Sequence, residues 1–162
     1  MNELSTAASA DNKKQSGGHA GFVHLRVHSA YSLSESTLRL NKLAELAAAD
    51  HQPALAITDS FNLFGAFEFT QKMMKVGIQP IIGTVVRLRD EDGTGEVVLL
   101  AQNEDGYVNL SDLISKALLT TDSDQKPEIC YKNLAQKQTG LLLLSGGYLS
   151  GFLGQPAWHG QD

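Results

Sequence analysis

Residues 22–29 read FVHLRVHS, and this stretch decides how the rest of the chain is interpreted. Its alternation at period two predicts a β-strand with apolar side chains on one face and His24, Arg26 and His28 on the other. Two imidazoles and a guanidinium on one short strand favour the lining of a functional cavity, and a metal site is the first hypothesis. Because a guanidinium cannot give up its proton to ligate a cation, Arg26 indicates that this strand has lost its metal chemistry.

Helical spacing of apolar residues predicts four helices downstream. The first starts within residues 34–37 and runs to about Asp50, and the third and fourth lie around residues 107–117 and Leu134. The second begins at Asn62 and is closed by Gly77. Its predicted apolar stripe consists of Leu63, Ala66, Phe67, Thr70 and Met74.

Four further runs predict strands, at residues 53–59, 77–83 with an extension to 89, 96–101 and 140–145. The first and last of these are continuous apolar runs, which are typical of strands buried on both faces. Strands alternating with helices predict an α/β fold with parallel strands and right-handed connections. The pattern alone leaves both a barrel and an open sheet possible.

Length, composition and charge limit the classes of protein to which this chain could belong. A chain of 162 residues can form one domain with a real core, and its formal net charge of −5 argues against a strongly basic nucleic-acid surface. Cys130 is the single cysteine, so no intrachain disulfide can form and a reducing compartment is expected. No run reaches membrane-spanning length and no secretory signal is recognisable, which predicts a cytoplasmic protein. Residues 1–21 are predicted to be a disordered leader, and residues 154–162 an irregular end.

Five segments together resemble the N-terminal PHP domain of the alpha subunits of bacterial DNA polymerase III, the replicative DNA polymerases. They are FVHLRVHSAYSL from Phe22, PALAITDSFNLFGAFEF from Pro53, GIQPIIG from Gly77, LLAQNEDGYVNLSDLISKA from Leu99 and GLLLLSGG from Gly140. The resemblance covers nearly everything after the leader. It implies that residues 22–153 are the N-terminal part of a PHP-type distorted β/α barrel, apparently truncated.

Metal-binding members of this family hold divalent ions with His, Asp, Glu and Cys side chains at strand ends. The resemblance carries these positions onto Arg26, His28, Glu35, Asp59, Ser60, Val85, Glu96 and Gly147. An imidazole, a carboxylate and a thiol of the family pattern are thereby lost, and a fixed positive charge is added. The resemblance therefore implies degenerate former metal positions, with no bound metal and no catalytic residue.

Simpler structural roles are also predicted for these positions. His28 and Asp59 are expected to form a buried polar pair with Arg26, because buried charges must be paired. Glu35 either remains a potential ligand or lies in the first turn of the first helix, where the helix dipole favours it. His24 is expected to be a hydrogen-bonded interior residue.

The function implied by the resemblance is that of a non-catalytic scaffold and docking module. The parent polymerase would perform template-directed DNA synthesis with magnesium ions, but the carboxylates that bind them lie outside this chain. The implied partners are the remainder of the alpha subunit and the proofreading exonuclease, with DNA contacted only through the full-length protein.

Two alternatives remain, a metal-dependent phosphoesterase and a truncated gene product with no independent role. A partial barrel would leave a sheet edge uncovered, so the isolated chain is expected to be marginally stable or to associate.

Overall fold

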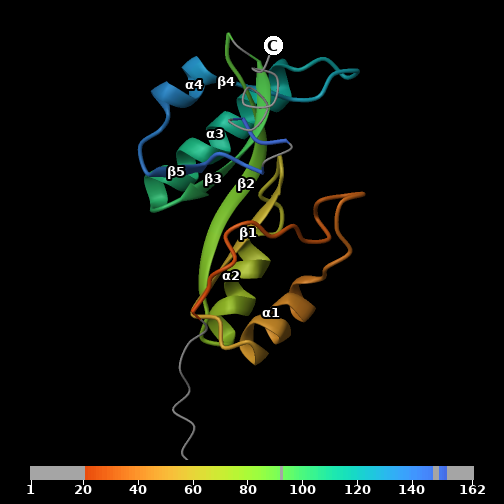
Figure 1. The fold of residues 1–162 in the computed structure, drawn as a ribbon, viewed down its shortest axis with the longest axis vertical. Coiled ribbons are helices and arrows are strands. Elements are labelled where there is room, and N and C mark those ends of the chain that lie inside the picture. The colour runs from red at the N-terminus through yellow and green to blue at the C-terminus, as the bar shows by residue number, and fades with distance from the viewer. Residues whose placement is uncertain (1–20, 92, 148–149, 153–162) are drawn as a thin grey trace, which may run out of the picture.

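A single mixed sheet organises the chain in the computed structural model, which describes residues 21–91, 93–147 and 150–152. The strand order is β1-β2-β3-β5, and β4 pairs with β2 (Figure 1). The strands are β1 (Ala54–Ser60), β2 (Gln79–Arg89), β3 (Thr94–Ala101), β4 (Ile129–Cys130) and β5 (Leu141–Leu144). The helices are α1 (Leu40–Ala49), α2 (Ala66–Lys75), α3 (Glu104–Thr120) and α4 (Tyr131–Gln136). The predicted leader, apart from Gly21, and the predicted irregular end lie outside the described residues.

The α/β class is confirmed, but the prediction of uniformly parallel strands was wrong for β3, which runs opposite to the other four described strands. β1 and β4 run parallel to β2, whereas β2 pairs antiparallel with β3, and β3 pairs antiparallel with β5. Only a short turn separates β2 from β3, and the Asp90 N–H closes it on the Gly93 carbonyl at 2.9 Å. Such a short connection makes a hairpin, since a parallel pair needs a crossover of about a dozen residues or more.

Residues 22–29 run beside β1 but do not form the regular strand that was predicted. The His24 carbonyl accepts from Ala56 N–H at 2.9 Å, and the Val27 carbonyl accepts from Thr58 N–H at 2.8 Å. Between these two hydrogen bonds, the segment advances by three residues while β1 advances by two. The Val27 N–H donates to the side-chain oxygen Thr58 Oγ1 at 2.9 Å. An extra residue of this kind is a bulge, and it breaks the side-chain alternation on which the strand prediction rested.

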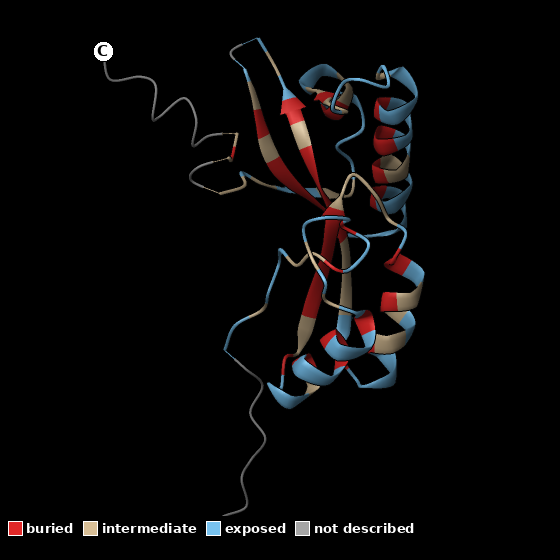
Figure 2. Cartoon of the chain, turned by 90° about the vertical axis from the view of Figure 1, so that its right-hand side faces the viewer, coloured by how far each residue is buried: buried red, intermediate tan, exposed pale blue. Residues whose placement is uncertain are grey.

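The sheet has two different faces. We call the side of the sheet that packs on the helices the helix face, and the opposite side the inner face. Figure 2 shows α2 and α3 on one side of the strands. The helix-face strand residues in the two larger core clusters are Leu55, Ile57, Val86, Leu88, Val97, Leu99 and Ile129. The inner-face strand residues in the third cluster are Ala56, Val85, Val98 and Leu100.

The predicted stripe of α2 was rotated from the observed one. Phe67 is 76% exposed and Met74 is also exposed, whereas Phe69 and Met73 are completely buried against β1 and α1. The buried set Ala66, Phe69 and Met73 has the i, i+3, i+7 spacing of one helix face. Gly77 follows α2 with a φ of +77°, as its predicted role requires.

The remaining helices are confirmed with smaller corrections. α1 begins at Leu40 rather than within residues 34–37, because Ser36 bonds its hydroxyl to the His28 carbonyl at 2.9 Å in the preceding loop. α3 buries Leu110, Leu113, Ile114 and Ala117, but Tyr107, which the same predicted apolar pattern included, is 42% exposed. The short helix around Leu134 is α4.

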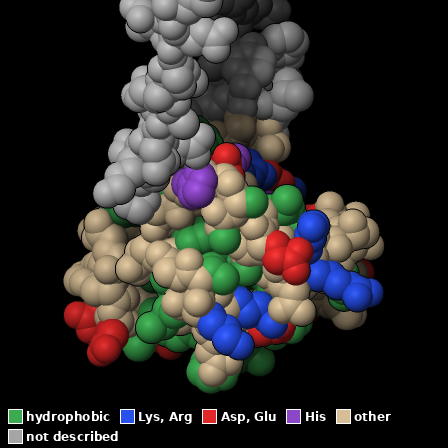
Figure 3. Space-filling model, turned by 90° about the horizontal axis from the view of Figure 1, so that it is seen from below, with side chains coloured by type: hydrophobic (Ala, Val, Ile, Leu, Met, Phe, Trp, Pro, Cys, Tyr) green, Lys and Arg blue, Asp and Glu red, His purple; other side chains and the backbone are tan. Residues whose placement is uncertain are grey.

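The lower end of the molecule, where α1 and α2 lie, presents a mixed surface. Hydrophobic side chains there are interspersed with basic and acidic ones (Figure 3). This face is therefore not a basic stripe of the kind that tracks a nucleic-acid backbone. No helix in the described ranges is long and apolar enough to cross a membrane.

Candidate functional site

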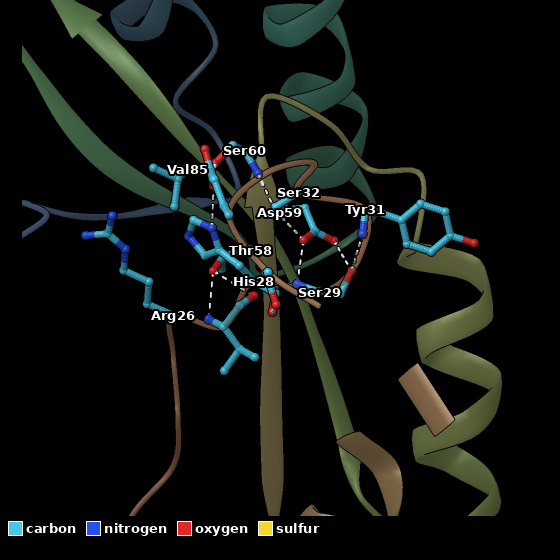
Figure 4. A network of polar contacts seen from close by, with 12 residues as sticks. Arg26, His28, Ser29, Tyr31, Ser32, Thr58, Asp59, Ser60 and Val85 are labelled. Carbon is cyan, nitrogen blue, oxygen red and sulfur yellow. Dashed lines mark hydrogen bonds and ion pairs between the residues drawn. The ribbon is translucent and has the colours of Figure 1, made fainter. Parts of the chain in front are cut away.

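The inner face of the sheet brings several of the matched positions together. Ser60 ends β1, Val85 is its register partner on β2, and Glu96 lies on β3. Alternation along the three strands places these side chains on the inner face, with Ala56 and Val98. The bulged segment adds Arg26 and His28 (Figure 4), and the loop after it adds Glu35 through the contacts described below.

An ion pair connects the bulged segment to β3. Arg26 Nη2 donates to Glu96 Oε2 at 2.9 Å, with about a third of each side chain exposed. The same carboxylate oxygen accepts from Ser150 Oγ at 2.8 Å, and the Glu96 N–H donates to the Ser150 carbonyl at 2.7 Å. A Cβ added at Gly147 would lie 3.8 Å from Arg26 Nη1, so this glycine adjoins the guanidinium. We call the three-part contact of Arg26, Glu96 and Ser150 the Glu96 clamp.

The hydrogen bonds and charges of the Glu96 clamp lower the pKa of Glu96. Partial burial raises this pKa, but hydrogen bonds from Ser150 and Arg26 and the charges of Arg26 and His28 outweigh burial and lower it below the ordinary 4.5. A carboxyl with a lowered folded pKa stabilises the fold above its unfolded pKa, and this contribution is lost as the pH falls through the folded pKa.

We therefore expect Glu96→Gln to lower the free energy of unfolding by up to about 1 kcal/mol above pH 5, as for other part-exposed ion pairs. The difference between variant and wild type should shrink as the pH falls below 4.5. Urea unfolding of both proteins between pH 3 and 7 measures it. A difference that stays constant across this range would show that the Glu96 charge contributes nothing.

A second polar contact joins His28, Glu35 and Ser60. Glu35 Oε2 lies 2.7 Å from His28 Nδ1 and accepts from Ser60 Oγ at 2.6 Å. The alternative that Glu35 occupies the first turn of a helix was wrong, because α1 begins only at Leu40. Ser60, one of the positions to which the resemblance carries the family pattern, is a hydrogen-bond donor to this carboxylate.

The carboxylate of Asp59 does not bond to Arg26 or His28, so the predicted buried polar contact among these three residues was wrong. Its carboxylate is 2% exposed and accepts from Ser29 N–H at 2.6 Å, Ser29 Oγ at 2.7 Å and Ser32 Oγ at 2.6 Å. Successive strand side chains point to opposite faces, so Asp59 and Ser60 diverge. Asp59 thereby anchors the loop after the bulged segment, on the side of β1 away from the ion pair (Figure 4).

Sequence reasoning missed three residues of this loop and misjudged His24 of the bulged segment. Ser29 and Ser32 hold Asp59, and their signal was the SAYS sequence at residues 29–32 directly after the histidine motif. Tyr31 donates its hydroxyl to Glu68 Oε2 at 3.0 Å, and this bond together with the Glu68 charge raises the pKa of Tyr31. His24 was expected in the interior but is exposed, with its ring edge-on to Phe22 at 4.9 Å.

The donor set does not fit the metal cluster that the family pattern would require. Arg26 cannot ligate, and Val85 and Gly147 have no donor side chain. The Glu96 carboxylate faces a guanidinium, and the Asp59 carboxylate is occupied by serine donors. Among the described residues, no group of three or more His, Cys, Asp or Glu side chains is arranged to hold a metal ion.

Comparison with known proteins gives consistent matches. A model of the PHP domain family matches residues 24–162. DNA polymerase III subunit alpha of Caulobacter vibrioides is 42% identical over 135 residues, covering 78% of this chain and 12% of that protein. The corresponding subunit of Vibrio cholerae is 39% identical over 129 residues, covering 78% of this chain and 11% of that protein. A solved amidohydrolase from Chromobacterium violaceum, with bound sulfate and no metal, aligns with a TM-score of 0.46 at 23% identity, covering 56% of this chain and 32% of that one.

Proposed function

Since the chain belongs to the PHP domain family, we propose that it is the N-terminal PHP portion of a DNA polymerase III alpha subunit and acts as a non-catalytic scaffold. The chain spans about an eighth of the length of the Caulobacter relative. Template-directed DNA synthesis and the magnesium ions it needs would therefore belong to the remainder of that longer protein. Under this proposal the protein works in the cytoplasm and contacts DNA only through the full-length subunit.

The observation that carries the proposal is the Glu96 clamp. In a metal-dependent phosphoesterase, the cations at the strand ends polarise the phosphate and supply the attacking hydroxide. Here a guanidinium lies 2.9 Å from the acidic side chain at a matched position, and it repels any cation that approaches. The inner-face residues therefore hold the bulged segment to β3 instead of organising a nucleophile. This favours a structural role over phosphoester hydrolysis.

Metal content and turnover test the catalytic half of this proposal. The purified chain is incubated with zinc or manganese, desalted, and assayed for bound metal and for hydrolysis of p-nitrophenyl phosphate. We expect substoichiometric metal and no turnover above that of a His28→Ala variant, which removes the imidazole that lies 2.7 Å from Glu35. Stoichiometric metal together with turnover that the variant lacks would establish the alternative, a metal-dependent phosphoesterase.

Partner binding tests the scaffold half. The proposed partners are the remainder of the alpha subunit and the proofreading exonuclease of the replicase. Titration of the chain with purified exonuclease, followed by calorimetry, should give saturable binding. Both the Glu96→Gln variant, which keeps the fold, and the wild type are expected to bind. A folded chain that gives no binding at 100 μM exonuclease would count against docking through this domain.

A further inference from the structure

We draw no further inference here: the strongest candidate, the exposed apolar surface of Phe64 and Phe67 where α2 begins, carries nothing because nothing in the structure shows what covers it.

Discussion

Replacing Asp59 by alanine is expected to lower the free energy of unfolding by roughly 3–5 kcal/mol, the cost of leaving buried partners of a charged group unpaired. The carboxylate is 2% exposed, and three donors from Ser29 and Ser32 point at it within 2.7 Å. Alanine leaves all three donors without an acceptor. Because the loop of residues 29–32 would lose its anchor, most of this loss should appear as a shifted urea midpoint with a nearly unchanged slope.

The matched control is Asp59→Asn, which keeps the shape and one carbonyl oxygen. It should lose only about 1–2 kcal/mol, since the Ser29 N–H and Ser32 hydroxyl can still bond to that oxygen. Ser32→Ala removes one donor to the carboxylate and also the acceptor of the Ser60 N–H at 3.2 Å, and should cost roughly 1–3 kcal/mol. An alanine variant no less stable than the asparagine variant would mean that the carboxylate does not anchor the loop.

The second large effect is expected at Phe69. Its side chain is completely buried in the cluster formed by α1, α2 and β1, so Phe69→Ala should cost roughly 3–5 kcal/mol through lost apolar contacts and the cavity left behind. Most domains have only 5–15 kcal/mol of stability, so this variant is expected to lie near the limit of folding. Urea unfolding, or the soluble yield if the variant does not fold, measures the loss.

Phe67→Ala is the natural comparison, because it makes the same change two residues away on the same helix. Phe67 is 76% exposed, and its removal should change the free energy of unfolding by no more than about 0.5 kcal/mol. Equal effects at the two positions, or a larger effect at Phe67, would restore the stripe that the sequence suggested and contradict the observed orientation of α2.

The contrast between these two phenylalanines shows where sequence reasoning reached its limit. Elements with a continuous apolar pattern, such as β1, and a strong heptad-like pattern, such as α3, were located correctly. In α2, however, Phe67 and Phe69 fit two different stripes of similar apolar content. The choice between them is made by what packs on the helix, and a single sequence does not contain that information. The direction of β3 was missed because alternating elements were taken as crossovers even where only a turn intervenes.

For the candidate site, the sequence predicted which positions lie close together but not all of their hydrogen-bond partners. The family resemblance brought together positions that do converge, such as Arg26 with Glu96 and His28 with Glu35. It could not give their new partners, since these depend on side chains outside the inherited pattern, such as Ser150 and Ser29. The role of Asp59 was misjudged because its strand parity, which opposes that of Ser60, was not applied.

The Glu96 clamp also has a temporal consequence. It joins Arg26, near the beginning of the described chain, to Ser150, near its end, through one carboxylate on a central strand. During synthesis the first of these residues leaves the ribosome long before the last. Arg26 can therefore pair with Glu96 only after β3 has emerged, and Ser150 completes the contact later still. Proteases should cut the segment around Arg26 more readily in a nascent chain stalled before β3 than in one stalled after residue 150.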